Sequence, residues 1–278
     1  IVLKEGVYTI DGDINISSNT GIQGQDTGSV IKVKNGISSN VNTLNVSGND
    51  CIIKNIMLNG NRANRTSGTQ RGIHLDGSSR CLIISTKVID FYNEGINITN
   101  ASRRNSIQSN LLNKNGSGTT ASIIIDSDFN TVDNNRLFNC KASAIVVKSG
   151  ASNCKVNNNY IITTVLDGIR TEFNHTQISA NYVFLVGRDG ISITGLSNII
   201  TANEIKDANN EGIKITTRYN VVNANKVIGS GDNGIFLSGN NVDVVANNIA
   251  DSGKNNILLD GASTCHISDN HVLGSTLR

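Results

Sequence analysis

Two short stretches decide the fold of this chain: residues 190–194 read Gly-Ile-Ser-Ile-Thr, and residues 212–216 read Gly-Ile-Lys-Ile-Thr. In both stretches isoleucine alternates with polar residues, which is typical of a β-strand with one buried face. The Gly-Ile pair, or a near copy of it, recurs along most of the chain at steps of 22 to 27 residues. Its isoleucines are Ile73, Ile96, Ile123, Ile145, Ile169, Ile191, Ile213, Ile235 and Ile257.

A second marker, asparagine two residues before an apolar residue, keeps the same phase. Self-similarity with a fixed period in the twenties indicates a solenoid, in which each repeat buries its apolar face only against its neighbours. Three short strands fit into each period, and no segment has helical apolar spacing. The sequence therefore predicts an all-β parallel β-helix of about ten or eleven coils. The marker asparagines are Asn110, Asn135, Asn159, Asn181, Asn203, Asn225, Asn247 and Asn270.

The recurring asparagine has a structural explanation. Each coil turns sharply between strands, and asparagine tolerates the positive φ that such turns require. Stacked amides also form hydrogen bonds from coil to coil. We therefore expect these residues to adopt positive φ and to form a ladder; a polar binding row is the alternative.

Composition narrows the class of protein. The 278 residues contain no proline and carry a net charge of +2. We expect one β-helix domain over residues 1–278 that is a fragment of a longer protein. No apolar run is long enough for a membrane span, and no basic run indicates a nucleic-acid partner. Cys81 and Cys154 fall three coils apart, about 14 Å, which exceeds disulfide reach.

The N-terminal sequence carries a resemblance. Residues 2–10 read Val-Leu-Lys-Glu-Gly-Val-Tyr-Thr-Ile, residues 18–24 read Ser-Asn-Thr-Gly-Ile-Gln-Gly, and residues 29–32 read Ser-Val-Ile-Lys. Together with the later repeats they resemble the pectate-lyase superfamily of right-handed β-helix proteins, which includes polysaccharide lyases, glycoside hydrolases, alginate epimerases and phage tailspikes. The motif sets of polygalacturonases and alginate epimerases are absent from this sequence. The resemblance implies a right-handed β-helix and an extracellular, secreted or virion-associated protein; a phage tail protein would be a homotrimer.

Charged residues concentrate on the outer face predicted for the Gly-Ile strands. The phase of the repeat predicts two exposed rows on that face, one formed by the residue after each isoleucine and one by the residue two positions later. These rows contain Asp126, Lys148, Arg170, Glu172 and Lys214. Asp126 and Glu172 fall two coils apart, about 9–10 Å, near the upper end of the carboxyl separation used in inverting glycoside hydrolysis. Lys148 lies between them and would act as a base in lyase chemistry. The alternative is a salt-linked cross-strand ladder.

The residue before each Gly-Ile pair forms a third row that is mostly acidic. Carboxylates on consecutive coils, about 5 Å apart, repel and raise one another's pKa. Arg170, Arg188, Lys214 or a bound Ca²⁺ would offset that repulsion, or one acid would serve as a proton donor. A simple turn preference is the other explanation. The row consists of Glu94, Asp167, Asp189, Glu211 and Asn233.

Two insertions, residues 58–72 and 114–120, interrupt the period, and long loops on a solenoid often wall a groove. We predict a polysaccharide-cleaving hydrolase or lyase that requires no cofactor and has no metal site apart from the Ca²⁺ alternative. A non-catalytic glycan-binding adhesin and a structural tail appendage are the competing hypotheses. The predicted substrate-binding residues are His74, Asp76, Lys214 and Glu211. The predicted catalytic residues are Asp126, Lys148, Asp167, Arg170, Glu172 and Asp189.

Overall fold

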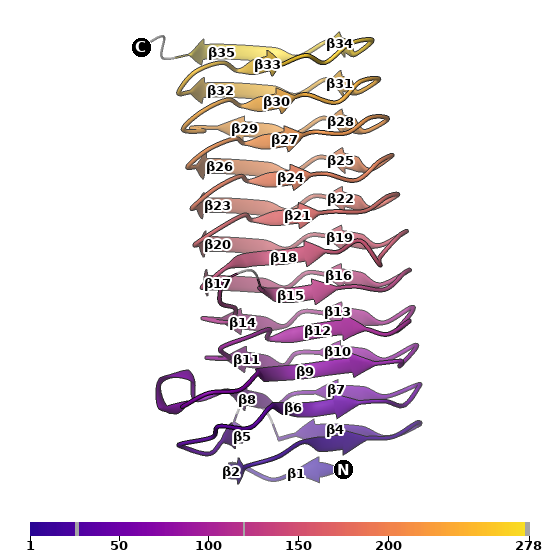
Figure 1. The fold of residues 1–278 in the computed structure, drawn as a ribbon, viewed down its shortest axis with the longest axis vertical. Helices are drawn as coiled ribbons and strands as arrows, with labels where there is room; N and C mark the ends of the chain where they lie inside the picture. The colour runs from indigo at the N-terminus through magenta and orange to yellow at the C-terminus, as the bar shows by residue number, and fades with distance from the viewer. Residues whose placement is uncertain (26–27, 119, 276–278) are drawn as a thin grey trace.

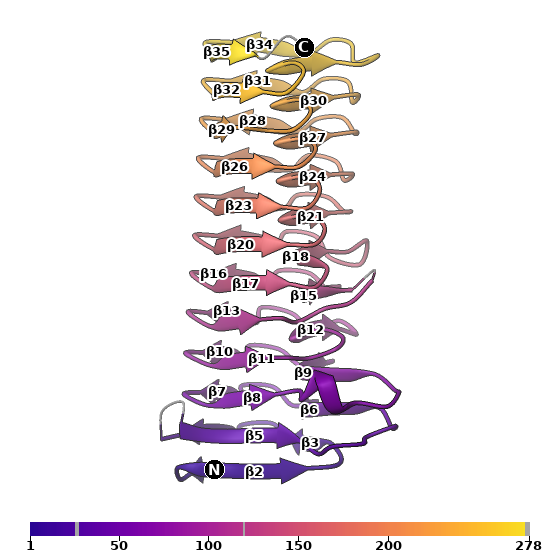
Figure 2. The same ribbon diagram turned by 90° about the vertical axis from the view of Figure 1, so that its left-hand side faces the viewer.

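The computed structural model describes residues 1–25, 28–118 and 120–275, which form a column of stacked coils (Figures 1 and 2). Each coil contributes one strand to each of three parallel sheets, so neighbours within a sheet are three strands apart in the chain. Sheets A and B have 12 strands each and sheet C has 11. The predicted parallel β-helix is confirmed, and it has about 12 coils because residues 1–60 add coils without the Gly-Ile pair.

The strands are short and evenly spaced. Sheet A consists of β1 (Val2–Leu3), β4 (Gly21–Gly24), β7 (Ile52–Lys54), β10 (Leu82–Ile84), β13 (Ser106–Gln108), β16 (Thr131–Asp133), β19 (Lys155–Asn157), β22 (Gln177–Ser179), β25 (Ile199–Thr201), β28 (Val221–Asn223), β31 (Asp243–Val245) and β34 (His266–Ser268). Sheet B consists of β2 (Gly6–Ile10), β5 (Ser29–Val33), β8 (Met57–Asn59), β11 (Lys87–Ile89), β14 (Leu111–Asn113), β17 (Arg136–Cys140), β20 (Tyr160–Thr164), β23 (Tyr182–Val186), β26 (Glu204–Ala208), β29 (Lys226–Ile228), β32 (Asn248–Ser252) and β35 (His271–Ser275). Sheet C consists of β3 (Ile14–Ile16), β6 (Val41–Val46), β9 (Gln70–Asp76), β12 (Ile96–Thr99), β15 (Ala121–Ile125), β18 (Ser143–Val147), β21 (Ile169–Thr171), β24 (Ile191–Ile193), β27 (Ile213–Ile215), β30 (Ile235–Leu237) and β33 (Ile257–Leu259).

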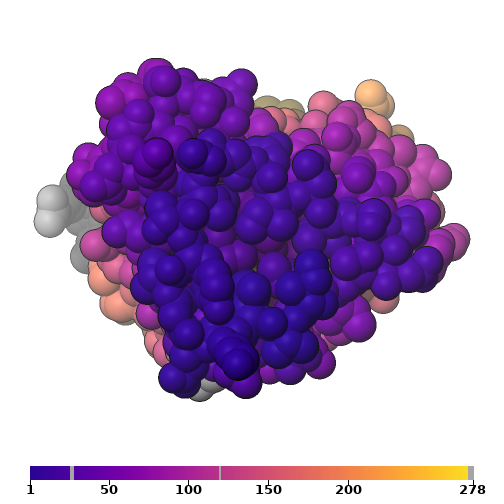
Figure 3. All heavy atoms as spheres, turned by 90° about the horizontal axis from the view of Figure 1, so that it is seen from below, coloured from indigo at the N-terminus to yellow at the C-terminus, as the bar shows by residue number. Residues whose placement is uncertain are grey.

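A 3₁₀ turn, η2 (Arg62–Asn64), lies in the loop between β8 and β9. None of the helical segments described is long and apolar enough to span a bilayer. Viewed from below, the atoms of the first coils form the N-terminal end face of the column (Figure 3).

The isoleucines of the Gly-Ile pairs form one continuous stack in the core. Each pairs in register with the next across sheet C, and all are fully buried except Ile257, which is half-buried in the last coil of that sheet. Glycine precedes the isoleucine because space there is restricted. A Cβ at Gly190 would clash with the Ile205 side chain and with the carbonyl oxygen of Gly212 on the next coil. The repeat therefore reflects close coil-to-coil packing.

The asparagine ladder is confirmed at the corner between sheets A and B. The side-chain amide of Asn203 donates to Oδ1 of Asn225 (3.0 Å) and to the carbonyl oxygen of Ile178 (2.9 Å). Its own Oδ1 accepts hydrogen bonds from the backbone N–H and the side-chain amide of Asn181 (3.0 and 2.9 Å). The same pattern runs from Asn110 to Asn270.

The predicted conformation of these asparagines is wrong. The residue with positive φ is the one before the ladder asparagine, as at Ala202 (φ 55°). The ladder asparagine is buried and turns its amide along the column axis, so the reversal of chain direction falls on its exposed neighbour. In successive coils this neighbour is Ser109, Asn134, Asn158, Ala180, Ala202, Ala224, Ala246 and Asp269.

Replacing Ala202 by asparagine is expected to raise the free energy of unfolding by ~0.5–1 kcal/mol. Alanine is strained in the left-handed region, whereas asparagine tolerates it. Two earlier coils already have asparagine at the equivalent position, Asn134 and Asn158, with φ of 54° at both. Denaturant unfolding of the Ala202→Asn protein beside the parent measures the difference, and a lower midpoint for the variant would contradict this explanation.

All five cysteines are free, as the spacing of Cys81 and Cys154 predicts for that pair. Burial raises the pKa of the Cys140 and Cys154 thiols to about 11. Thiols that stay protonated at neutral pH are poor nucleophiles, so these two residues act as small core side chains.

Candidate functional site

The outward residues of sheet C form two rows in strict register. The residue after each buried isoleucine pairs with its counterpart on the next coil, so that Arg170 lies between Val146 and Ser192. The second row follows two residues later. There the N–H groups of Asp126, Lys148 and Glu172 each donate to a carbonyl on the preceding coil. The predicted order Asp126, Lys148, Glu172 on consecutive coils is therefore present.

The prediction that the whole first row is exposed is wrong. Ile124 and Val146 are buried and pack with Ala121 in a small apolar cluster separate from the main core. Asn97 and Ser192 are also buried. Ile124 and Val146 stack on adjacent coils and shield each other from water, and the next residue of the row, Arg170, is half-buried.

The mid-sheet charge cluster, which we define as Asp126, Lys148, Arg170, Glu172 and Lys214, occupies half-buried positions on sheet C. Arg170 Nη2 lies 2.9 Å from Glu172 Oε1, so these two side chains form an ion pair. Asp126 Oδ1 accepts a hydrogen bond from the N–H of Gly150 (3.1 Å). Because these side chains are only half-buried on sheet C, a ligand bound to the outer face of that sheet would contact them.

The residues that precede the Gly-Ile pairs form a row that we call the acid row: Glu94, Asp167, Asp189, Glu211 and Asn233. This row lies at the corner between sheets B and C, and all five residues are buried. Arg188 donates two hydrogen bonds of 3.0 Å to the carboxylate of Asp167, and Lys214 Nζ lies 3.9 Å from Asp189 Oδ2. Arg188 and Lys214 are thus the cations that offset the repulsion between the acids. Within the described chain, no three His, Cys, Asp or Glu side chains are grouped to hold a metal ion.

Three carboxylates of this row, those of Asp167, Asp189 and Glu211, also accept a hydrogen bond from the backbone of the next coil. Asp167 accepts the N–H of Asp189 (3.3 Å), Asp189 accepts that of Glu211 (3.4 Å), and Glu211 accepts that of Asn233 (2.8 Å). At the N-terminal end of the row, Glu94 pairs with Arg71 (2.7 Å). These contacts give the row a structural role at the corner, and catalysis by Asp167 or Asp189 stays a prediction.

Burial changes the acidity of two members of the row. Loss of hydration raises the pKa of the Asp167 carboxyl, with Arg188 opposing and Asp189 adding to that rise. Loss of hydration also raises the pKa of Glu211, against the hydrogen bonds from Asn233. Glu211 has no cation within ion-pair distance among the described side chains. A carboxyl of this kind retains its proton to higher pH and can donate it.

Replacing Glu211 by glutamine is expected to raise the melting temperature above neutral pH by roughly 2–4 °C. Because the folded-state pKa of Glu211 is raised, its contribution to stability is fully present below its ordinary pKa of 4.5 and is lost as pH rises through the folded value. Glutamine carries no charge at any pH, so the variant does not lose this stability as the pH rises. Melting curves from acidic to alkaline pH measure the effect, with Glu5→Gln at an exposed position as control.

The predicted binding residues His74 and Asp76 are half-buried on β9, in the same two rows. His74 Nε2 lies 2.9 Å from Thr99 Oγ1, and burial lowers the pKa of the imidazole from its ordinary value. His74 Nδ1 and Asn97 Oδ1, on adjacent coils, are buried polar atoms without a hydrogen-bond partner in the described residues. In the first row, Asn97, Ile124 and Val146 lie between His74 and Arg170.

Most clustered aromatic side chains lie on sheet B. Tyr160 and Tyr182 stack with centroids 5.0 Å apart and planes at 11°, flanked by Phe138 and Phe184. Arg136 and Lys206 lie over rings of this group. Rings that stack on one another have their faces occupied, so this group stabilises the sheet.

The comparisons with known proteins agree with this architecture. A family model described as "Right handed beta helix region" matches residues 149–276. No curated protein sequence matches the chain. Among solved structures, the A-module of mannuronan C-5 epimerase AlgE4 from Azotobacter vinelandii superposes with a TM-score of 0.87 at 15% identity, covering 100% of this chain and 88% of the module.

Two other solved structures share the fold. The Dettilon tailspike protein has a TM-score of 0.76 at 16% identity, with 99% of this chain and 62% of the tailspike covered. The catalytic unit of a GH87 α-1,3-glucanase from Streptomyces thermodiastaticus has a TM-score of 0.68 at 12% identity, with 99% of this chain and 63% of that unit covered. The chain is a right-handed parallel β-helix protein.

Proposed function

We propose that this protein is a carbohydrate-active β-helix that binds a polysaccharide along sheet C and cleaves it, as a glycoside hydrolase or a polysaccharide lyase. The mid-sheet charge cluster carries the proposal, because half-buried charges of both signs occupy nearby coils between β15 and β27. Later coils of the same rows present mostly uncharged residues, Phe236, Ser238 and Leu258, and one acid, Asp260. Structural neighbours that include a mannuronan epimerase, a tailspike and a glucanase support an extracellular, secreted or virion-associated role.

The residues available suit acid–base chemistry on a sugar. Arg170 places a positive charge 2.9 Å from Glu172. Burial favours the protonated form of Glu211 and Asp167. Glycoside hydrolysis uses a protonated carboxyl as the general acid and an ionised carboxylate as the base or nucleophile. In a lyase, Arg170 or Lys214 would neutralise a uronate carboxylate while Lys148 removes a proton.

A non-catalytic glycan-binding protein is the second candidate. The observation that favours it is that Asp167, Asp189 and Glu211 already hold the next coil through backbone hydrogen bonds. Carboxylates engaged in this way hold the corner together whether or not a reaction takes place. An adhesin or a tail appendage would use the charges of sheet C for binding alone.

Incubation with a panel of polysaccharides separates these functions. The panel includes polygalacturonate, alginate and α-1,3-glucan, and the products are followed by reducing ends, by ultraviolet absorbance of unsaturated ends, and by NMR for altered sugar configuration. New reducing ends without absorbance indicate a hydrolase, and both signals together indicate a lyase. Binding with no new ends indicates an adhesin, or an epimerase where the NMR spectrum changes. Failure to bind any glycan would overturn the proposal.

A further inference from the structure

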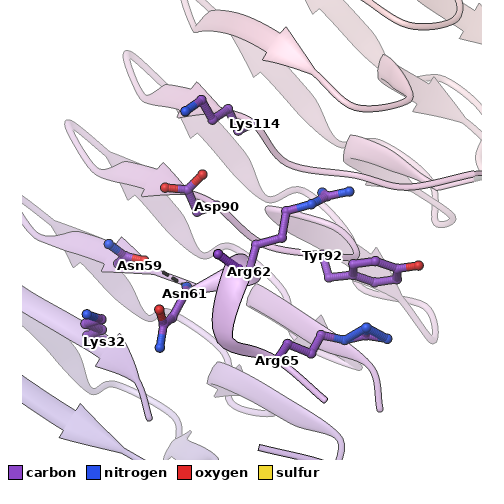
Figure 4. A pocket seen from close by; sticks show the side chains of 9 residues that line it. Lys32, Asn59, Asn61, Arg62, Arg65, Asp90, Tyr92 and Lys114 are labelled. Atoms are coloured by element: carbon purple, nitrogen blue, oxygen red, sulfur yellow. Dashed lines mark hydrogen bonds between the residues drawn. The ribbon is translucent and has the colours of Figure 1, made fainter. Parts of the chain in front are cut away.

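A basic pocket of about 640 Å³ lies outside the corner between sheets B and C, beside the loop from β8 to β9 (Figure 4). Its charged lining residues are four cations, Lys32, Arg62, Arg65 and Lys114, and one acid, Asp90. Lys32 belongs to β5, Asp90 follows β11 and Lys114 follows β14, so successive coils and the loop build the pocket together. Both insertions predicted to wall a groove contribute to it.

The positive charge of the basic pocket is not balanced by the protein. None of its four cations lies within 4.0 Å of a carboxylate in the described part of the chain. Four like charges around one hollow repel one another, and a single Asp90 offsets only part of that repulsion. An anion bound in the pocket would lower the electrostatic energy of the folded protein.

The two arginines are held in position for binding. Arg62 Nη1 donates to the carbonyl oxygens of Phe91 (3.3 Å) and Gly116 (2.7 Å), which joins the two insertions. Arg65 Nε donates to the carbonyl oxygen of Gly68 (3.1 Å), and its Cζ lies 3.6 Å from the centroid of the Tyr92 ring. Fixed guanidinium groups lose little entropy on binding, and their remaining N–H donors match a planar carboxylate.

The loop that carries these arginines is also fixed. Asn61 adopts a left-handed conformation (φ 53°); its N–H donates to Asn59 Oδ1 (2.8 Å) and its side-chain amide donates to the carbonyl oxygen of Val33 (3.0 Å). Thr66 Oγ1 donates to the carbonyl oxygen of Ile37 (2.9 Å). The pocket is therefore formed before any ligand arrives, and Asn59 supplies an amide at its edge.

We infer that the basic pocket binds anionic sugar units, uronic acid residues of the polysaccharide, with one carboxylate held by Arg65 and another by Lys114. These two side chains lie on opposite sides of the pocket (Figure 4), so a segment of more than one unit contacts both. The inference rests on the proposed function for the class of ligand. The excess positive charge of the pocket favours an anionic ligand. The side-chain amide of Asn59, the ring of Tyr92 and the pocket volume suit a sugar ring attached to the carboxylate. The loop leads directly into β9, which carries His74 and Asp76 on sheet C, so a polymer held here extends toward that face.

Titration with oligogalacturonate and oligomannuronate tests the inference on the whole chain by calorimetry. We expect Arg65→Gln and Lys114→Gln each to weaken binding roughly tenfold, which is the loss of one charge-assisted hydrogen bond. Lys155→Gln, which removes an exposed lysine from sheet A, is the matched control and should leave affinity unchanged. Carboxyl-reduced oligosaccharides of the same length should bind at least tenfold more weakly.

The outcomes that overturn the inference are distinct from failure of the proposed function. Equal affinity of the parent and the Arg65→Gln, Lys114→Gln double variant would overturn it, as would binding of inorganic phosphate or sulfate without binding of either oligosaccharide. The effect of Glu172→Gln on cleavage tests the proposed function separately, because Glu172 does not line the basic pocket. Uronate binding that depends on Arg65 and Lys114 therefore supports the pocket even if no polysaccharide of the panel is cleaved.

Discussion

Replacing Asn203 by valine is expected to lower the free energy of unfolding by ~3 kcal/mol or more. Valine keeps none of the hydrogen bonds of the Asn203 side chain with Asn181, Asn225 and Ile178. The groups left without partners are buried, and each unsatisfied buried donor or acceptor costs about 1–3 kcal/mol. Denaturant unfolding followed by circular dichroism measures the loss.

The control for that variant is Asn248→Val, an exposed position on β32 of sheet B. Valine suits an exposed strand, so we expect a change within about 0.5 kcal/mol there. If the two variants unfold at the same denaturant concentration, the ladder contributes little and the corner is held by backbone hydrogen bonds alone.

Replacing Glu172 by glutamine, or Asp189 by asparagine, is expected to lower activity at least ~100-fold on any polysaccharide that the parent cleaves. Glutamine keeps the size of Glu172 but removes the negative charge that pairs with Arg170. Asparagine at position 189 can still accept the N–H of Glu211 through Oδ1, so the corner should stay folded. Initial rates and melting temperatures measured together separate lost chemistry from lost structure.

Matched controls for these two variants are Glu204→Gln on sheet B and Asp243→Asn on sheet A. Both make the same chemical change far from sheet C and should leave the rate unaltered. Full activity in both Glu172→Gln and Asp189→Asn would place the reaction elsewhere, and the next candidates are His74 and Asp76 on β9.

The register of the fold could be predicted from sequence because two independent markers share one period. The isoleucine after glycine and the ladder asparagine each fix the phase of a different corner. The coil position of the residues between them can therefore be counted from the sequence. The sequence prediction places the left-handed turn residue one position too late, because Ala180, Ala202, Ala224 and Ala246 give no turn signal. Alanine is tolerated there because the buried asparagine beside it anchors the turn.

The candidate site could be predicted only in part. The phase of the repeat places Asp126, Lys148 and Glu172 on consecutive coils and the acids in one row, but it does not indicate how deeply each side chain is buried. Burial of the acid row depends on how sheets B and C meet, which a one-dimensional pattern does not contain. The basic pocket left no periodic signal, because Lys32, Asp90 and Lys114 come from different coils and meet only through the loop that carries Arg65.

The asparagine ladder has a direction. In the bonds between asparagines, each side-chain amide donates to the asparagine of the next coil and accepts from that of the preceding coil, from Asn181 through Asn203 and Asn225 to Asn247. Amide dipoles aligned head to tail polarise their neighbours, so each bond in the series is stronger than it would be alone. Interrupting the series at one coil therefore also weakens bonds on the coils beside it. Two interruptions on adjacent coils should together cost less than the sum of each made separately.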